Sequence, residues 1–520
     1  MLRRFCDPRL QPLFSCTRLV AFASLIACGG ASGDDSEAGA GDESSSDATG
    51  EIESSGSAGE TGETDASSGD TSSTTGDESG ETGATGDIEL SLSENPDMSI
   101  APFANIVASD ASEVRIVVSQ QGTVIFTRVV TDIEPGDASS LRTFVWGLEA
   151  DTEYEIMAEA DLPAGLAQSE TLAWTTGSLP EFVPSLSISD HVEGQAHEGL
   201  VIFGSKTEGN QVYVGANPEG KIVWYHATGG TGNKLNGDVK QLDDGRLLLF
   251  QPAGIRIIEP WGELVTEIDT TFHHDLTPLP NGNFLILGRV NKTINVVPLG
   301  GDVSVQVDTL EEITPSGAQV RFWSADDHLD TQYYPSELSQ NGPPYDWTHA
   351  NAAYYDAQED RVLLSARHLH WIVGINWSSG EVDWKLGPGG DFTLDGVAED
   401  WFYAPHAPMA DGEGRLLVYD NGNERPGGSA YSRGVLIGYD EVAMTASVEW
   451  EYQIIPQTLF LGDADRLSNG NVLLTAGGTS TSLEEVALIE VSDDDPAEVV
   501  WRMVIDNGGN TFRATHLDTL

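Results

Sequence analysis

The stretch FYAPHAPMADGEGRLLVYD, residues 402–420, contains the unit from which the larger part of the chain is built. DGEG is a tight turn, and RLLVYD has the composition of a strand that packs into a sheet. The same strand-turn-strand phrase recurs as QLDDGRLLLF (241–250), PLPNGNFLIL (278–287), YYDAQEDRVLLSA (354–366) and RLSNGNVLLTAG (466–477). This part of the sequence is therefore a repeat built from antiparallel strands.

A second phrase alternates with the first and ends in tryptophan or another apolar residue. It occurs six times, as GKIVWYH (220–226), GELVTEID (262–269), GAQVRFW (317–323), GEVDWKL (380–386), ASVEWEY (446–452) and AEVVWRM (497–503). The spacing is close to the roughly 40–50 residues of a four-stranded propeller blade. We therefore predict an all-β fold in which residues 186–520 form a six-bladed β-propeller.

A smaller β-rich region precedes the repeats. Residues 88–180 contain short β-branched and aromatic runs separated by turn residues, which predicts a small β-sandwich. GLEADTEYEIMAEA, residues 147–160, resembles the late hairpin of a fibronectin type III-like module, with Tyr154 as a tyrosine-corner residue. A spacer role and a binding role both remain open for this domain.

The first 87 residues are a targeting segment and a tether. Arg3 and Arg4 precede an apolar run that ends in LIAC, which resembles a bacterial lipobox with Cys28 as the lipidated residue. We predict a signal peptide over residues 1–28 and an acidic Gly/Ser/Thr-rich, disordered linker over residues 29–87. The expected location is the bacterial cell envelope, lipid-anchored in the periplasm or on the outer membrane surface.

Charge and cysteine usage limit the partners of the chain. The 25 Lys and Arg face 83 Asp and Glu, a formal net charge of −58, which argues against nucleic acid and anionic membrane surfaces as partners. The membrane contact we expect is the lipid anchor alone. The three cysteines all lie within the first 28 residues, so no intramolecular disulfide is expected in the mature chain. The sequence leaves open whether the chain forms a homodimer.

Histidines recur at one position of the repeat. When the repeats are aligned on their turns, His274 and His406 stand nine residues before the end of the turn. If the turn of the YYDAQED unit is about three residues longer, His349 joins the same column. Asn351 lies two residues further along the strand and shares its face. Arg367 follows in LLSARHLHW, and we interpret the neighbouring His273, His368 and His370 as packing or supporting residues.

Two chemistries are open to such a ring of imidazoles. Three histidines can hold a catalytic zinc ion if their nitrogens lie about 2 Å from one point. Alternatively, histidines spread around a channel, with a guanidinium and an amide, suit a tetrahedral oxyanion ester. No metal or other cofactor is needed in the second case.

The motifs resemble those of bacterial arylsulfate sulfotransferases, the enzymes that work without the nucleotide sulfate donor. The matching segments are residues 273–287, 346–387, 402–423 and 512–520, and the most specific part is DWTHAN followed by SARH and PHA. The resemblance implies a six-bladed propeller, an aryl sulfate donor and a phenolic acceptor. It implies that His406 becomes transiently sulfated, that His349, Arg367 and His274 hold the sulfuryl group and assist the phenolic oxygen, and that Asn351 contacts the sulfate.

Alternatives and departures accompany this resemblance. The prolines around His406 are not part of the family pattern, and the HHDL segment leaves open whether His273 or His274 is functional, although the register favours His274. The alternative functions are a metal-dependent propeller hydrolase or lyase and a non-catalytic, surface-anchored binding propeller.

Overall fold

A computed structural model of the chain describes residues 83–84, 88–131, 140–207, 210–228, 237–251, 254–334, 342–428, 431–478, 486–506 and 511–520. The predicted signal peptide, its lipidation site Cys28 and most of the predicted linker lie outside these residues. Two residues of the predicted linker, Gly83–Ala84, form strand β1. None of the helices in the described residues is long and apolar enough to cross a membrane.

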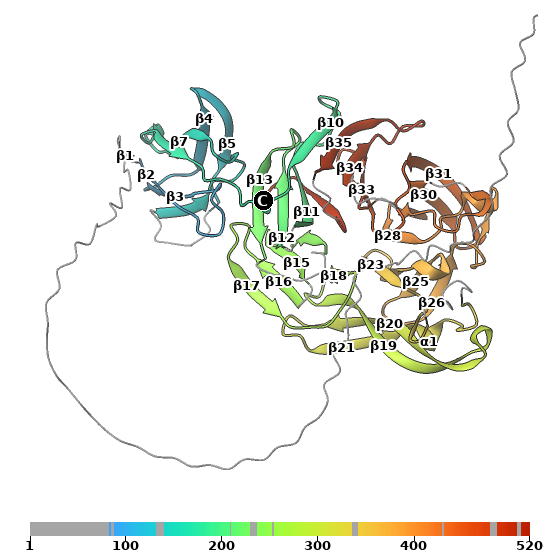
Figure 1. Ribbon diagram of the computed structural model, residues 1–520. Coiled ribbons are helices and arrows are strands. Elements are labelled where there is room, and N and C mark those ends of the chain that lie inside the picture. Colours follow the sequence, from blue (N-terminus) through green and yellow to red (C-terminus); the bar gives the residue numbers. More distant parts are fainter. Residues whose placement is uncertain are drawn as a thin grey trace, which may run out of the picture. The chain divides into compact units, whose positions relative to one another are not determined.

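The described residues form an all-β structure, as the sequence predicts. The helical elements are a single turn of α-helix, α1 (Ala325–His328), and the short 3₁₀ segments η1 (Val297–Leu299), η3 (Arg367–Leu369), η4 (Ala398–Asp400) and η5 (Pro426–Gly428). Strands make up most of the remaining described residues (Figure 1).

Two antiparallel sheets form the N-terminal region. One has the order β1–β2–β3–β6, with β2 (Ile88–Ser93), β3 (Phe103–Ala108) and β6 (Ser140–Phe144); the other contains β4 (Val114–Gln120), β5 (Thr123–Val129), β7 (Glu153–Leu162), β8 (Gly165–Gln168) and β9 (Leu172–Thr175). Ile88 and Ile106 of the first sheet share one buried core with Val118 and Ile156 of the second. The Tyr154 hydroxyl accepts a hydrogen bond from the Glu149 backbone N–H at 2.9 Å, which is the tyrosine-corner contact.

Six further sheets follow along the chain, and each is named here by one of its strands. The β11 sheet contains β11 (Leu200–Thr207), β12 (Asn210–Ala216), β13 (Ile222–Ala227) and β36 (Ala514–Leu517); the β14 sheet contains β14 (Val239–Gln241), β15 (Leu247–Gln251), β16 (Gly254–Ile258) and β17 (Leu264–Ile268); the β18 sheet contains β18 (Leu276–Pro278), β19 (Phe284–Val296), β20 (Gly301–Ile313), β21 (Gln319–Ser324) and the paired β22 (Tyr345–Asp346).

The other three sheets have the same meander. The β23 sheet contains β23 (Ala350–Asp356), β24 (Arg361–Ala366), β25 (Trp371–Asn376) and β26 (Val382–Leu386); the β28 sheet contains β28 (Pro405–Ala410), β29 (Arg415–Asp420), β30 (Ser432–Asp440), β31 (Thr445–Ile454) and β27 (Thr393–Leu394); the β32 sheet contains β32 (Asp463–Arg466), β33 (Val472–Ala476), β34 (Val486–Val491), β35 (Val499–Ile505) and β10 (Leu186–His191). The two recurring sequence phrases thus correspond to the first turn and the fourth strand of these sheets.

The β11 sheet combines strands from distant parts of the sequence. Its first three strands are consecutive, but β36, the last described strand, pairs antiparallel with β11. Arg513, directly before β36, donates to Asp238 at 3.3 Å, to Asp275 at 2.8 Å and to the Asn351 carbonyl at 3.0 Å. One buried guanidinium therefore connects the first strands of the β14, β18 and β23 sheets with β36.

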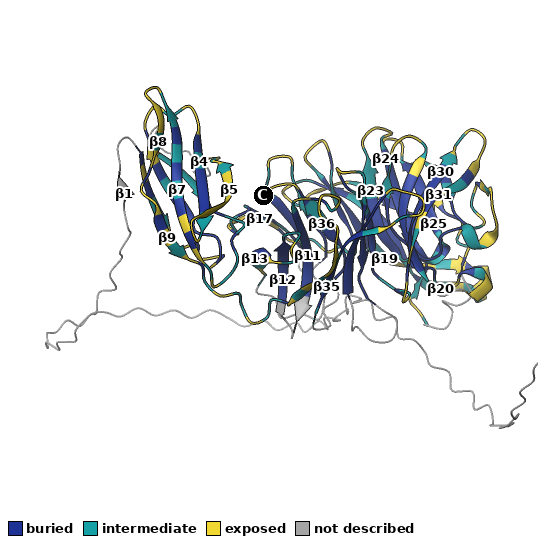
Figure 2. Ribbon diagram, turned by 90° about the horizontal axis from the view of Figure 1, so that it is seen from above, coloured by how far each residue is buried: buried dark blue, intermediate teal, exposed yellow. Residues whose placement is uncertain are grey.

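Burial follows the strands and exposure follows the turns (Figure 2). All six residues of β24 and of β34 are buried, which is typical of strands covered on both faces. In β7, by contrast, buried and exposed residues alternate, because that sheet has one face in water. Of the candidate histidines, His406 is buried, whereas His274 and His349 are half-buried.

Candidate active site

The predicted site residues lie at the beginning of the first strands of two sheets and within the first strand of a third. His274 precedes β18, His349 directly precedes β23, and His406 is the second residue of β28. The side chains of His406 and Asn351 are 0% exposed and that of Arg367 is 5% exposed. The candidate residues are thus mostly removed from water, where charge interactions are stronger than at the surface.

The register argument of the sequence is wrong for His349. Asp356 pairs with Arg361, whereas the corresponding turn in the β28 sheet closes between Asp411 and Arg415, so the YYDAQED turn is one residue longer and not three. Asn351, not His349, is therefore the counterpart of His406. A β-bulge in each strand also shifts the pairing locally. His349 belongs to the loop that precedes β23.

His274 and His349 nevertheless lie side by side. Their ring centres are 5.3 Å apart in an edge-to-face arrangement. Both residues have left-handed backbone angles, with φ of 56° and 45°, a conformation that costs a residue other than glycine about 1 kcal/mol or more. Two loops from different sheets thus hold two imidazoles together at the expense of local backbone strain.

Hydrogen bonds fix the protonation pattern of the two consecutive histidines. His273 Nε2 lies 3.1 Å from the Gly288 carbonyl, which can only accept, so Nε2 carries the proton in the neutral ring. His273 Nδ1 must then accept from His274 Nδ1, 2.8 Å away. The assignment places the lone pair of His274 on Nε2 in the neutral ring. His273 therefore acts on His274 and not as its substitute.

His349 is oriented by a carboxylate. Its Nδ1 donates to Asp346 Oδ2 at 2.5 Å, which fixes the tautomer and places the lone pair on Nε2. Burial opposes ionisation of Asp346, but the neighbouring His349 outweighs it and lowers the pKa of Asp346. His368, whose ring centre is 4.5 Å from that of His349, has a pKa well below its ordinary value because of burial and of His349. His368 is thus a neutral neighbour.

This group also has donors suited to a metal ion. One ligand atom each from Asp346, His349 and His368 lies within 4.8 Å of the others. Two histidines and a carboxylate are a common ligand set for zinc and other transition metals. The metal alternative of the sequence therefore finds a specific candidate here, formed by a different set of residues from the three histidines that suggested it.

Asp308, on β20, holds both histidine segments. It is 3% exposed, and its Oδ2 accepts from the Thr348 hydroxyl and from the Ala350 backbone N–H, the latter at 2.7 Å. Its Oδ1 lies 3.4 Å from His273 Nε2. One buried carboxylate thus fixes the backbone on both sides of His349 and the ring that supports His274.

His406 is held by strand pairing. It pairs with Tyr419, and Pro405 beside it pairs with Asp420. The Pro405 carbonyl accepts from Asn351 Nδ2 at 3.0 Å and from Ser365 Oγ at 2.8 Å. Because both donors belong to the β23 sheet, the strand that carries His406 is joined to the sheet that follows His349. Pro405 and Pro408, which flank His406 and Ala407, are compatible with the position of β28 at the edge of its sheet.

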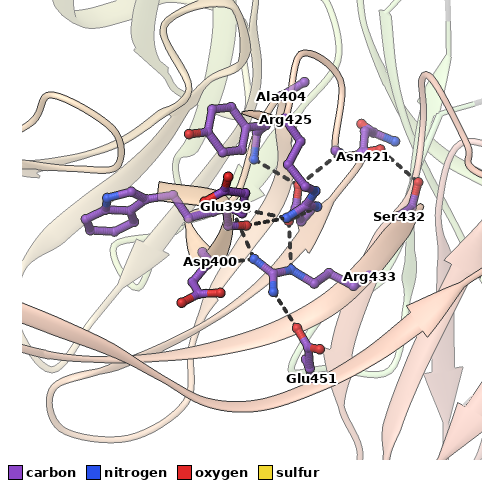
Figure 3. Close-up of polar contacts among 12 residues, drawn as sticks. Glu399, Asp400, Ala404, Asn421, Arg425, Ser432, Arg433 and Glu451 are labelled. Atoms are coloured by element: carbon purple, nitrogen blue, oxygen red, sulfur yellow. Dashed lines mark hydrogen bonds and ion pairs between the residues drawn. The ribbon is translucent and has the colours of Figure 1, made fainter. Parts of the chain in front are cut away.

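An ion network behind β28 fixes the loop that leads to His406. Asp420 Oδ2 accepts from Arg425 at 2.6 Å and from Arg433 at 2.9 Å, and its Oδ1 accepts from the Tyr403 backbone N–H. The two guanidinium groups lie beside each other and reach the carbonyls before residue 402, with Glu451 at the outer end of Arg433 (Figure 3). The His406 segment therefore rests on a buried charge cluster.

Arg367 lies in η3, directly after β24. Its Nη2 donates to the Leu459 carbonyl at 3.0 Å, and Asn423 donates to the same carbonyl at 2.8 Å. Within the described residues, Arg367 Nε has no hydrogen-bond partner although it is buried. A buried N–H group without a partner is costly, so this donor is suited to an anionic ligand.

Left-handed residues concentrate around this region. The described residues contain twelve positive-φ residues other than glycine, and seven of them lie near the histidines: His274, His349, His370, Ala404, Ala407, Glu424 and Leu461. Strain of this kind persists where the surrounding structure enforces it, often at functional sites. Glu424 lies 3.3 Å from His370, and the hydrogen bond to His370 lowers the pKa of Glu424.

A cavity of about 320 Å³ lies between the first strands of the sheets and is lined by Ala352 and Ala407, the residues that follow Asn351 and His406. Its charged lining residues are Asp238, Lys240, Asp275, Asp463, Asp465, Arg466 and Arg513. Burial opposes ionisation of Asp275, but Arg513 and Lys240 outweigh it and lower its pKa. Burial and the Asp238 charge instead raise the pKa of Asp465 to about 7.

The sequence interpretation missed the carboxylates that orient the histidines. Asp346 stands three residues before His349 in DWTHAN, a local signal that was present in the sequence. Asp308 and Asp420 carry no such signal, because each reaches its partners across strands. Arg513 was likewise not identified, since its contacts lie more than 160 residues away in sequence.

Comparison with known proteins adds one strong match and several partial ones. The family model described as Arylsulfotransferase (ASST) matches residues 187–511. Two curated proteins named Arylsulfate sulfotransferase AssT, from Escherichia coli O6:H1 and from Lelliottia amnigena, are 30% identical over 140 residues and 31% identical over 142 residues. Each match covers 21% of this chain and only 23% of the relative.

Solved structures show only weak similarity. A protein of unknown function from Bacteroides caccae matches with 13% identity and a TM-score of 0.32, covering 66% of this chain and 94% of that one. Dihydro-heme d1 dehydrogenase NirN matches with 12% identity and a TM-score of 0.26, covering 71% and 73%. These similarities are too low to support an argument about fold or function.

Proposed function

Because the chain belongs to the arylsulfotransferase (ASST) family, we propose that it transfers a sulfuryl group from a phenolic sulfate ester to a phenolic acceptor through a sulfated histidine. The observation that carries this proposal is the meeting of His274 and His349, ring centres 5.3 Å apart, in a strained and carboxylate-oriented arrangement. The buried Arg367 donor and the buried His406 support the same proposal.

In the first half-reaction, a ring nitrogen of His406 attacks the sulfur atom of the donor. The N–S bond forms while the bond between sulfur and the phenolic oxygen breaks in line, and the phenol leaves with its bonding electron pair. Sulfuryl transfer resembles phosphoryl transfer, in which positioning and charge stabilisation supply most of the catalysis. The rigid support of the β28 strand meets that requirement.

A proton must follow the leaving oxygen. Phenols have a pKa near 10, so a phenolate leaves more easily when an acid donates to it. We assign this donation to a ring nitrogen of His349 or His274 in its protonated, imidazolium form, since Asp346 and His273 orient the two rings through their Nδ1 atoms. In the second half-reaction, the same nitrogen removes the proton from the acceptor phenol, whose oxygen attacks the sulfur and releases His406.

Arg367 provides permanent positive charge for the sulfuryl oxygens. A guanidinium keeps its charge at any physiological pH and donates in a planar fork. Asn351, linked to Pro405 through its side chain, lies on the strand beside His406 and completes the polar surroundings. This assignment predicts ping-pong kinetics, because donor and acceptor react in separate steps.

Turnover of p-nitrophenyl sulfate with phenol as acceptor tests the proposal. We expect p-nitrophenol release that requires phenol for multiple turnovers, together with formation of phenyl sulfate. Release at the same rate without acceptor, with inorganic sulfate as the product, would instead indicate a hydrolase.

A metal-dependent hydrolase is the second candidate, favoured by the ligand atoms of Asp346, His349 and His368. Activity that is lost on chelation, restored by Zn²⁺ and abolished in His368→Gln would support this candidate. Transfer activity that survives both chelation and His368→Gln would exclude it.

We also propose that the six sheets are the blades of a propeller and that the two N-terminal sheets form a fibronectin type III-like sandwich. The repeated four-stranded meander, the pairing of β36 with β11 and the contacts of Arg513 support the first part. A crystal structure tests it, with the six first strands expected around one axis.

Lipidation at Cys28 is a further proposal, supported by the LIAC segment of the sequence. It would anchor the chain in the bacterial cell envelope through acyl chains. Fractionation of cells that express the full chain tests it. We expect the chain in the membrane fraction and its Cys28→Ser variant outside that fraction; equal partitioning of the two would contradict the proposal.

A further inference from the structure

A second group of titratable side chains lies where β36 joins the β11 sheet. His516 is on β36, Asp518 follows that strand, and His197 lies in the loop before β11. One ligand atom from each of the three lies within 4.8 Å of the others. The proposed sulfuryl transfer uses none of these residues.

One ring nitrogen of His197 lies close to two oxygen atoms. Its Nε2 is 3.2 Å from Asp518 Oδ1 and 2.7 Å from Ser468 Oγ. Ligand atoms that are about 2.0–2.2 Å from a tetrahedral zinc ion lie about 3.3 Å from one another, so the first of these distances already fits shared coordination. His197 thus faces two oxygen atoms from separate segments of the chain.

Hydrogen bonds to Glu490 hold the backbone around His197 in place. Its N–H lies 3.0 Å from both oxygens of Glu490, which also accepts from the amides of Asn469 and Asn471 at 2.9 and 2.6 Å. Glu490 thereby ties the His197 loop to the turn that carries Ser468. Supporting hydrogen bonds of this kind are typical of metal centres.

The histidine side chains are buried and crowded. The side chain of His197 is 7% exposed, and its Nδ1 has no hydrogen-bond partner among the described residues. Its ring centre lies 3.7 Å from that of His516, closer than the roughly 4.5–7 Å usual for aromatic pairs. An ion bound by both rings would hold them at a defined separation.

A small cavity lies against the two histidines. His197, His516 and Glu490 line a cavity of about 10 Å³, close to the volume that one water-sized sphere occupies. Gly199, with φ of 154°, allows His516 to approach, because a side chain at that position would begin 2.6 Å from His516 Cε1. Asp518 is 72% exposed and marks the solvent side, through which an ion can enter.

We propose that His197, His516 and Asp518 bind a divalent transition-metal ion, Zn²⁺ by its ligand preference, which locks β36 to the β11 sheet and to the turn that carries Ser468. Ser468 Oγ or a water molecule supplies the fourth ligand. Because the three segments are far apart in sequence, the bound ion stabilises the folded state relative to the unfolded chain.

Metal-dependent thermal unfolding of the full chain, purified without a polyhistidine tag and treated with a chelator, tests this site. We expect Zn²⁺ to raise the Tm of the wild-type chain. Asp518→Asn, on an exposed side chain, should leave the metal-free Tm unchanged and weaken Zn²⁺ binding by more than the roughly 10–100-fold typical of lost supporting contacts. His516→Gln should abolish the rise.

His368→Gln is the matched control, since it removes a ligand from the other metal-capable group and should leave the Zn²⁺-dependent rise intact. The visible absorption of bound Co²⁺, measured on the same variants, reports the ligands directly and does not depend on stability or enzymatic activity. An unchanged Tm in the wild-type chain, or a rise that survives in Asp518→Asn and disappears in His368→Gln, would overturn the proposal.

Discussion

His406 and the His274–His349 pair are held in place by different means. His406 lies inside a strand, is fully buried, and rests on pairing with β29 and on the Asp420 charge cluster. His274 and His349 lie on strained loop residues and depend on the individual hydrogen bonds that they donate to His273 and Asp346. The difference fits the proposed roles. The nucleophile needs a fixed position, which the strand provides, whereas the groups that transfer protons need a defined tautomer, which their hydrogen bonds provide.

The largest effect is expected at His406. His406→Ala should lower the transfer rate from p-nitrophenyl sulfate by about 10⁴-fold or more, because the covalent route is lost. His191→Ala, on an exposed histidine of β10, is the control and should keep full activity. A His406 variant that is folded and within tenfold of the wild-type rate would remove this residue from the nucleophile role.

The Asp420 charge cluster that supports the His406 segment should contribute to the free energy of unfolding. Asp420→Asn removes the carboxylate that two buried guanidinium groups share, and such a change costs about 3–5 kcal/mol in the free energy of unfolding. Glu451→Gln removes only the half-exposed partner of Arg433 and should cost about 1 kcal/mol or less. Chemical denaturation of both variants measures the difference. Equal losses would show that Asp420 has no special role.

Arg367 tests how the site would bind the sulfuryl oxygens of the substrate. Arg367→Met should lower kcat by about 10²–10³-fold, since one preorganised donor to developing charge has that value in a site without bulk water. Arg367→Lys keeps the charge but not the planar fork, and should recover only part of the loss. Full activity in Arg367→Met would assign this side chain to packing against the Leu459 loop alone.

Asp346 tests the tautomer argument. Asp346→Asn preserves the shape but replaces the carboxylate that accepts the His349 Nδ1 proton by an amide, which can also donate and so stabilise the other tautomer. We therefore expect kcat to fall by about 10–100-fold, part of what a general acid contributes. The pH profile is the decisive measurement, because a purely structural role would lower kcat equally at every pH. We expect the acidic limb of the profile to shift in Asp346→Asn.

The smallest effect concerns the acidic cavity. Burial raises the pKa of Asp465 to about 7, above its unfolded value near 4, so protonation favours the folded state. Its stabilising contribution is complete below about pH 4 and is lost as the pH rises through 7. We expect the wild-type chain to lose on the order of 1–2 kcal/mol between pH 5 and pH 8 from this residue, because its partial exposure weakens the full value of about 1.4 kcal/mol per pKa unit. Asp465→Asn should remove that part of the loss in urea unfolding, and an unchanged pH dependence would contradict it.

The sequence predicted the repeats far better than the site. Glycine turns and alternating strand phrases are local signals, so the all-β class and the four-stranded units could be predicted from them. His349 was placed correctly near His274 but by a wrong register, because the length of the 356–361 turn and the two β-bulges are not visible in the sequence. The contacts of Asp308, Asp420 and Arg513 cross between strands and sheets, and a single sequence does not contain that information.

The central claim is that His406 becomes covalently sulfated, and rapid mixing with excess p-nitrophenyl sulfate in the absence of phenol tests it most directly. The account predicts a burst of one p-nitrophenol per chain and, by peptide mass spectrometry, one added SO₃ group on His406. Phenol added afterwards should remove that group as phenyl sulfate. A linear time course without a burst, or an SO₃ group on His274 or His349, would contradict the account.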